Sequence, residues 1–218
     1  MTGIYRKTLI LFSFFFISLG HAQSGSMKQK DSLKFSNKIV PDRIWREAYV
    51  ALSHYPELKD TPIEFKFKSE IDKSFMQAQP TLGSLLKKRK NRSYIIFISE
   101  EIDIEGEKFS VTTVPSEVLI GWLGHELGHI MDYRDRRNIE LIWFGLKYMT
   151  SKNYIREAER AADTYAVNHG LGQQIIATKD FILNHTRLTD QYKERIKDLY
   201  LSPDEIMALI DEVHDELN

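Results

Sequence analysis

Two histidines and a glutamate near the middle of the chain have the spacing of a metal site. The segment His125-Glu126-Leu127-Gly128-His129 places the two histidines four residues apart. On an α-helix, residues i and i+4 lie one turn apart on the same face, so both imidazoles can bind one ion. Glu126 lies about 100° around the helix from His125, where it can reach a metal-bound water without binding the metal. The motif predicts a metal site with a general base beside it.

The residues around this motif favour a helix over 116–134. Val118, Leu119 and Trp122 precede the histidines at helical spacing. Two imidazoles and a carboxylate on an apolar helix face are costly to bury without a partner. A bound metal ion would supply that partner.

The type of metal follows from the residues that could bind it. The sequence has no cysteine, so His and carboxylate side chains must hold any transition metal. We expect one Zn²⁺ per chain, with a third protein ligand and an open fourth position. Glu159 and Asp163 share one face of a predicted helix. Glu159 can reach the metal, and Asp163 can accept a hydrogen bond from the far nitrogen of a ligating imidazole. Glu157 and Asp135 remain alternative third ligands.

The combination of His-Glu-x-x-His with a downstream Glu-x-x-x-Asp resembles the gluzincin metallopeptidases. Residues 159–167, Glu-Arg-Ala-Ala-Asp-Thr-Tyr-Ala-Val, resemble the branch that contains the CAAX prenyl endopeptidases and their bacterial heat-shock and outer-membrane quality-control relatives. The resemblance covers residues 116–170 and continues weakly at 194–196. It implies a zincin-like fold and a set of roles: zinc ligands His125, His129 and Glu159, general base Glu126, and supporting carboxylate Asp163.

These residues predict a zinc-dependent endopeptidase that acts on a peptide or protein substrate. Tyr154, Tyr165 and His169 are candidates to stabilise the oxyanion. By analogy with zincins, an extended substrate would pair with Ser93–Ser99 or Lys108–Val114. The alternative hypothesis is a catalytically silent, zinc-containing binding or scaffold protein of the cell envelope.

The N-terminus predicts export. Arg6 and Lys7 precede an apolar run from Thr8 to Leu19, and small residues end at Ala22. This pattern is typical of a signal peptide, here residues 1–22, whose cleavage near Ala22 would release a periplasmic or secreted protein. We expect a flexible lead-in over residues 23–40 and a single metallopeptidase-like domain over residues 41–218.

The remaining pattern predicts an α+β fold, with a small antiparallel or mixed sheet of about three strands before a helical half that carries the metal site. The expected strands are Pro62–Lys68, Ser93–Ser99 and Lys108–Val114. The expected helices cover residues 41–54, 116–134, 138–149 and 153–168, and the last helix begins with a capping box at Ser202.

Charge and hydropathy limit the possible partners. The chain has 30 Lys and Arg against 31 Asp and Glu, which gives no reason to expect a nucleic-acid partner. The apolar stretch from Leu141 to Met149 could lie on a membrane, but its short length favours a place in the core. The sequence does not determine the oligomeric state.

Overall fold

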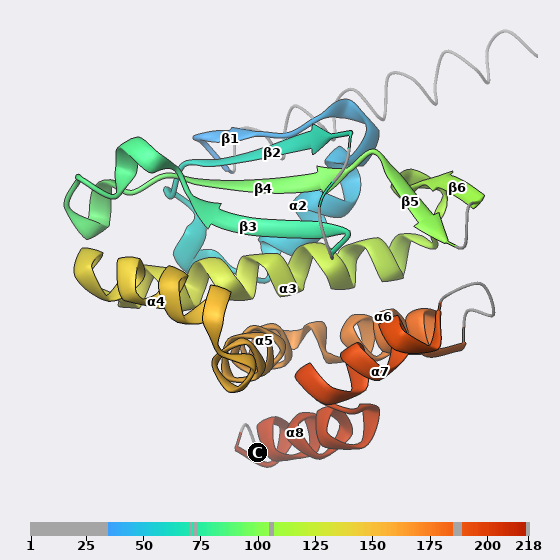
Figure 1. Ribbon diagram of the computed structural model, residues 1–218. Helices are drawn as coiled ribbons and strands as arrows, with labels where there is room; N and C mark the ends of the chain where they lie inside the picture. The colour runs from blue at the N-terminus through green and yellow to red at the C-terminus, as the bar shows by residue number, and fades with distance from the viewer. Residues whose placement is uncertain (1–34, 70, 72–73, 105–106, 185–188, 217–218) are drawn as a thin grey trace, which may run out of the picture. The chain divides into compact units, whose positions relative to one another are not determined.

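The computed structural model describes residues 35–69, 71, 74–104, 107–184 and 189–216 (Figure 1). The predicted signal peptide, residues 1–22, lies outside the described residues, as does most of the predicted lead-in. Asn37–Asn218 form one compact unit. Within the described ranges, no helix combines the length and the hydropathy needed to cross a membrane.

The fold is α+β and contains a mixed sheet of four strands in the order β1-β2-β4-β3. The strands are β1 (Lys38–Ile39), β2 (Ile63–Lys68), β3 (Met76–Pro80) and β4 (Tyr94–Ser99). β1, β2 and β4 run parallel, and β3 pairs with β4 in the antiparallel direction. The two strands predicted at Pro62–Lys68 and Ser93–Ser99 are confirmed. The predicted lead-in at 23–40 ends in a strand, because Lys38 and Ile39 pair with β2.

Two features of the sheet differ from the prediction. β3 was not predicted, since its sequence Met-Gln-Ala-Gln-Pro carries no β-branched or aromatic residue and forms a strand only by pairing with β4. The expected strand Lys108–Val114 does not join this sheet. Its first residues belong to β6 (Glu107–Ser110), which forms a separate hairpin with β5 (Glu101–Ile104), and Val111–Thr113 form a 3₁₀ turn, η5.

The described part of the same unit also contains seven α-helices. They are α2 (Trp45–Ser53), α3 (Ser116–Asp135), α4 (Asn138–Thr150), α5 (Lys152–Ala166), α6 (Gly172–Asn184), α7 (Asp190–Leu199) and α8 (Pro203–Glu216). The predicted capping box is present, because Glu205 N–H donates to Ser202 Oγ and Ser202 N–H donates to the Glu205 carboxylate. Gly170, with φ of 77°, lies in the irregular turn Val167–Leu171 that joins α5 to α6.

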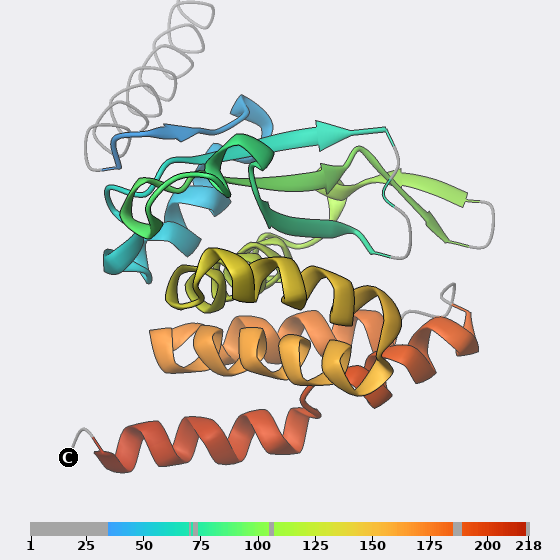
Figure 2. The same cartoon turned by 60° about the vertical axis from the view of Figure 1, so that its left-hand side comes forward.

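Helix α3 lies between the sheet and the layer formed by α5 and α6 (Figures 1 and 2). Glycines allow α3 to approach both helices closely. A Cβ atom on Gly128 would lie 2.4 Å from the carbonyl oxygen of Ala162 on α5. A Cβ atom on Gly121 would lie 2.3 Å from the carbonyl oxygen of Gln174 on α6. This close packing brings the side chains of α3 next to those of α5 and α6.

Candidate metal centre

Three buried side chains converge where α3 meets α5. His125 and His129 come from successive turns of α3, and Glu159 comes from α5. Oε2 of Glu159 lies 3.1 Å from Nε2 of His125 and 3.4 Å from Nε2 of His129. One ligand atom from each residue lies within 4.8 Å of the other two. The structure therefore brings together the two histidines and the third ligand expected from the sequence.

The spacing of these atoms fits a metal ion. Zinc bonds to imidazole nitrogen and carboxylate oxygen at about 2.0–2.2 Å, so two ligands of a tetrahedral site are separated by roughly 3.3–3.5 Å. The separations of 3.1 and 3.4 Å around Oε2 of Glu159 are close to this value. All three residues are buried, with exposed fractions of 8% or less. His125, His129 and Glu159 could thus hold one metal ion.

Asp163 fixes the orientation of the His125 ring. Its Oδ1 lies 2.8 Å from Nδ1 of His125, so that nitrogen carries the hydrogen and Nε2 is left to face Glu159. Burial alone would raise the pKa of the Asp163 carboxyl, but Lys179 and His125 hold that pKa below its ordinary value. Asp163 therefore stays ionised and holds the ring of His125, which is the contact that the sequence analysis expected of it.

Lys179 was not predicted from the sequence, although it is part of this network. Its Nζ lies 2.9 Å from Oδ2 of Asp163 and 4.1 Å from the ring centroid of Tyr200. Lys179 is only 4% exposed. The sequence held one signal: on α6, Lys179 lies four residues after Ile175 and three before Ile182, in the middle of the apolar face.

Glu126 lies next to His125, His129 and Glu159 without belonging to this candidate metal-binding group. Its Oε2 accepts a hydrogen bond of 2.6 Å from the backbone N–H of Ala78 on β3. Burial raises the pKa of the Glu126 carboxyl, and the nearby imidazoles offset only part of that effect. The hydroxyl of Tyr133, also on α3, donates to the carbonyl of Ala78 over 3.4 Å. Helix α3 is thus joined to the edge strand through Glu126 and, two turns later, through Tyr133.

Glu159 is held from a third helix. Its Oε1 accepts a hydrogen bond from the hydroxyl of Tyr148 on α4. Burial disfavours its charge, but the imidazoles of His129 and His125 hold its pKa well below the ordinary value. For His125, burial lowers the pKa, but hydrogen bonds to Asp163 and Glu159 outweigh it and raise the pKa to about 10. Metal binding would displace this proton, which couples metal affinity to pH.

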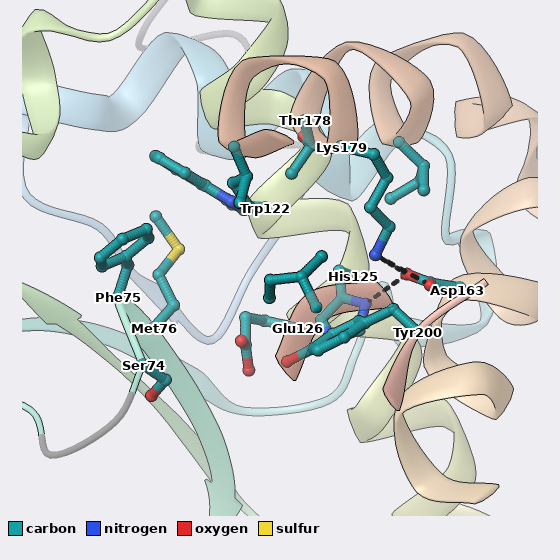
Figure 3. A pocket seen from close by; sticks show the side chains of 13 residues that line it. Ser74, Phe75, Met76, Trp122, His125, Glu126, Asp163, Thr178, Lys179 and Tyr200 are labelled. Carbon is teal, nitrogen blue, oxygen red and sulfur yellow. Dashed lines mark hydrogen bonds and ion pairs between the residues drawn. The ribbon is translucent and has the colours of Figure 1, made fainter. Parts of the chain in front are cut away.

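A cavity of about 50 Å³ lies beside His125 and Glu126 (Figure 3). Asp163 and Lys179 form its polar wall. The remaining walls are mainly apolar and aromatic side chains from β3, α3, α6 and the end of α7. Met76, Trp122, Ile175 and Tyr200 are among them. An apolar cavity with a few convergent polar groups is typical of a binding site for part of a ligand.

The other ligand candidates lie elsewhere. Glu157 is exposed, although it is only two residues from Glu159. Asp135 ends α3 in an exposed position, where its carboxylate accepts the Tyr165 hydroxyl at 3.3 Å. Neither acid belongs to the metal-binding group found among the described residues.

The three oxyanion candidates contact residues away from the cavity. The Tyr154 hydroxyl accepts from Arg136, and Tyr165 faces Asp135. The His169 ring stacks on Tyr55 with centroids 4.4 Å apart. None of the three lines the cavity. By contrast, Tyr200 lines it, with its ring centroid 5.5 Å from that of His125.

Comparison with known proteins identified no relative of the chain. No protein-family model matches the chain, and neither a curated protein nor a solved structure matches it significantly. What can be said about function therefore depends on the residues and geometry of this site.

Proposed function

We propose that the chain is an exported, zinc-dependent endopeptidase. The observation that carries this proposal is the position of Glu126, beside the His125–His129–Glu159 group and bonded to the edge strand β3. A purely structural metal site has no use for a buried carboxylate at this position. The resemblance of residues 116–170 to gluzincins supports the same hypothesis.

Zinc is the metal that best suits these donors. Two imidazoles and one carboxylate are a common ligand set for catalytic zinc, which keeps a fourth position open. When bound, zinc acts as a Lewis acid and lowers the pKa of water from 15.7 toward about 7. Asp163 would keep Nε2 of His125 available as a ligand, and Tyr148 would hold Glu159 in place.

Glu126 would be the proton carrier of the reaction. Its raised pKa makes the carboxylate a better base than an exposed glutamate, and its conjugate acid can then protonate the leaving amine. The hydrogen bond from Ala78 would keep the carboxylate aligned with the edge of the sheet.

An extended peptide would pair with β3. The earlier candidate β4 is flanked by β2 and β3, so it has no free edge, and β6 belongs to a separate hairpin. β3 is an edge strand, and the backbone groups of Ala78 point away from β4, where Glu126 and Tyr133 of α3 already bind them. Met76, two residues before, presents its backbone groups to the same side and lines the cavity. Pairing at Met76 would provide main-chain hydrogen bonds that depend little on the substrate's sequence, and it would not displace the hydrogen bonds of Ala78.

One pair of variants tests the proposal. A chain lacking residues 1–22 should bind close to one zinc ion and cleave an unfolded protein such as casein. Glu126→Gln should keep the zinc and lose hydrolysis. Glu117→Gln, an exposed glutamate in the first turn of the same helix, should behave like the wild type. If Glu126→Gln cleaves a broad substrate panel as well as the wild type does, the peptidase proposal fails while the metal site stands.

A further inference from the structure

Helix α4 presents an apolar face to solvent. Its exposed large side chains are Ile139, Ile142, Trp143, Leu146 and Met149, with exposed fractions between 51% and 84%. Their spacing of three and four residues places them on one stripe of the helix. The opposite side, with Leu141 and Phe144, is buried against the protein. The exposed stripe is therefore not part of the core.

A second exposed segment combines leucines with cations. Leu82 and Leu86 are 83% and 93% exposed. They are followed by the exposed run Lys87, Lys88, Arg89 and Lys90, and residues 82–92 contain no acid. An exposed leucine beside a lysine run has no role in the packing of this unit.

The two features adjoin each other. The side chain of Asn138, at the start of α4, donates to the carbonyl of Lys87 over 3.0 Å. Arg89 donates to the carbonyl of Asp135 over 2.9 Å. Arg92, 1% exposed, donates to the carbonyl of Tyr133 over 2.8 Å. Both views show the segment that precedes β4 beside the N-terminal end of α4 (Figures 1 and 2). We call residues 82–90 together with the exposed stripe of α4 the α4 surface.

The charge around the α4 surface is opposite in sign to that of the chain. The full sequence carries a net charge of −1. Besides the run at 87–90, Arg137 and Lys147 are exposed on α4 or next to it, whereas the nearby Lys152 pairs with Asp198. The acid within α4, Glu140, pairs with Arg137 at 2.7 Å. Positive charge is thus concentrated around an apolar stripe.

We propose that the α4 surface docks the protein onto an anionic phospholipid bilayer. Apolar and indole side chains of the stripe would enter the headgroup boundary, where tryptophan is favoured, and the cations would contact lipid phosphates. A second copy of the chain is a poorer occupant, because a two-fold interface would bring the lysine and arginine residues of two identical surfaces together. Through Tyr148, the same helix contacts the ligand Glu159, so docking would place the metal centre near the lipid surface.

Vesicle flotation tests this proposal without any activity measurement. The chain without residues 1–22, which keeps the whole unit Asn37–Asn218, would be mixed with phosphatidylcholine vesicles that contain or lack phosphatidylglycerol. We expect binding that requires phosphatidylglycerol and weakens in 0.5 M salt. Ile142→Ser with Trp143→Ser should reduce binding at least tenfold. Lys87→Glu with Lys88→Glu should reduce it several-fold and flatten its salt dependence.

Matched controls come from exposed residues elsewhere. Met207→Ser on α8, and Lys59→Glu with Lys66→Glu on and beside β2, should bind like the wild type. Equal binding to vesicles without phosphatidylglycerol would overturn the proposal, and so would unchanged binding of the α4 variants. A dimer in size-exclusion chromatography that is lost in the Ile142→Ser, Trp143→Ser variant would also overturn it, since the stripe would then be a subunit interface.

Discussion

The ammonium of Lys179 lies 2.9 Å from Oδ2 of Asp163, and both side chains are buried, with exposed fractions of 4% and 0%. This ion pair supports the candidate metal centre indirectly, because Oδ1 of the same carboxylate forms a hydrogen bond with the ring of His125. The face of α3 that carries His125 and His129 is therefore supported by two helices: α5 contributes the carboxylate and α6 contributes its counter-charge.

Replacing Lys179 should destabilise the fold. Lys179→Met leaves the buried Asp163 charge with only the His125 imidazole and the Leu201 N–H as partners, which costs up to about 3–5 kcal/mol of unfolding free energy. Combining it with Asp163→Asn should cost less than the sum of the two single changes, because the uncompensated charge is removed. Lys197→Met, at an exposed lysine, should change stability by less than about 0.5 kcal/mol. Denaturant unfolding compares the wild type, the two single variants, the double variant and the Lys197→Met control, and additive effects would contradict the coupling.

Removing Glu159 should weaken metal binding directly. Glu159→Ala deletes one of the three proposed ligands, so the zinc dissociation constant should rise by at least about 100-fold, more than the 10–100-fold typical of a supporting residue. Glu157→Ala should leave zinc affinity unchanged, since that side chain is exposed. Competition with a chromophoric chelator gives both values. Full zinc retention by Glu159→Ala would show that another acid completes the site.

Two glycine substitutions should have opposite effects. Gly128→Ala puts a Cβ 2.4 Å from the Ala162 carbonyl oxygen, so α3 and α5 must separate, at a cost of about 1–3 kcal/mol. Gly145→Ala on α4 meets no atom within 4 Å and should stabilise the protein by about 0.5–1 kcal/mol through helix propensity. Thermal unfolding followed by circular dichroism compares the two. Equal tolerance of both alanines would contradict the close packing at Gly128.

Acid should weaken the attachment of α8. The Arg160 guanidinium, helped by the backbone N–H of Ser202, lowers the pKa of Glu205 to about 2. A carboxyl with a lowered pKa contributes stability above its unfolded value near 4.5 and loses it as the pH falls toward 2. The pair is exposed, so we expect on the order of 1 kcal/mol or less. Wild type and Glu205→Gln should differ in unfolding free energy at pH 6 and converge near pH 2.

Tyr200 should affect turnover more than substrate binding. Its ring borders the cavity beside Glu126, where a hydroxyl can donate to the oxyanion of the proposed reaction. Tyr200→Phe should lower kcat on an unfolded protein by about 10- to 1,000-fold, with KM and zinc content little changed. Tyr165→Phe, whose hydroxyl faces Asp135, serves as the control. Wild-type kcat in Tyr200→Phe would remove Tyr200 from the mechanism.

Local patterns accounted for the elements that carry the site. The helix over 116–134 was predictable because apolar residues recur at its period, and the structure extends it by one residue. The pairing of Glu159 with Asp163 could be predicted because residues four apart lie on one face of a helix. Strand β3 could not be predicted from the sequence, since Met76–Pro80 forms a strand only by pairing with β4. Lys179 and Ala78 were missed as partners because they are 16 and 48 residues away from the groups that they contact.

The sequence alone determined which side chains could bind a metal and which helix would present them, because these properties depend on residue type and on spacing within one element. Only the tertiary structure decided which acid completes the group, which strand lies at the edge of the sheet beside α3, and which face of α4 meets solvent. Those choices depend on the packing of α3 against α5 and α6, where glycines bring the backbones into contact. Contacts between distant segments are set by this packing, and no local pattern specifies them.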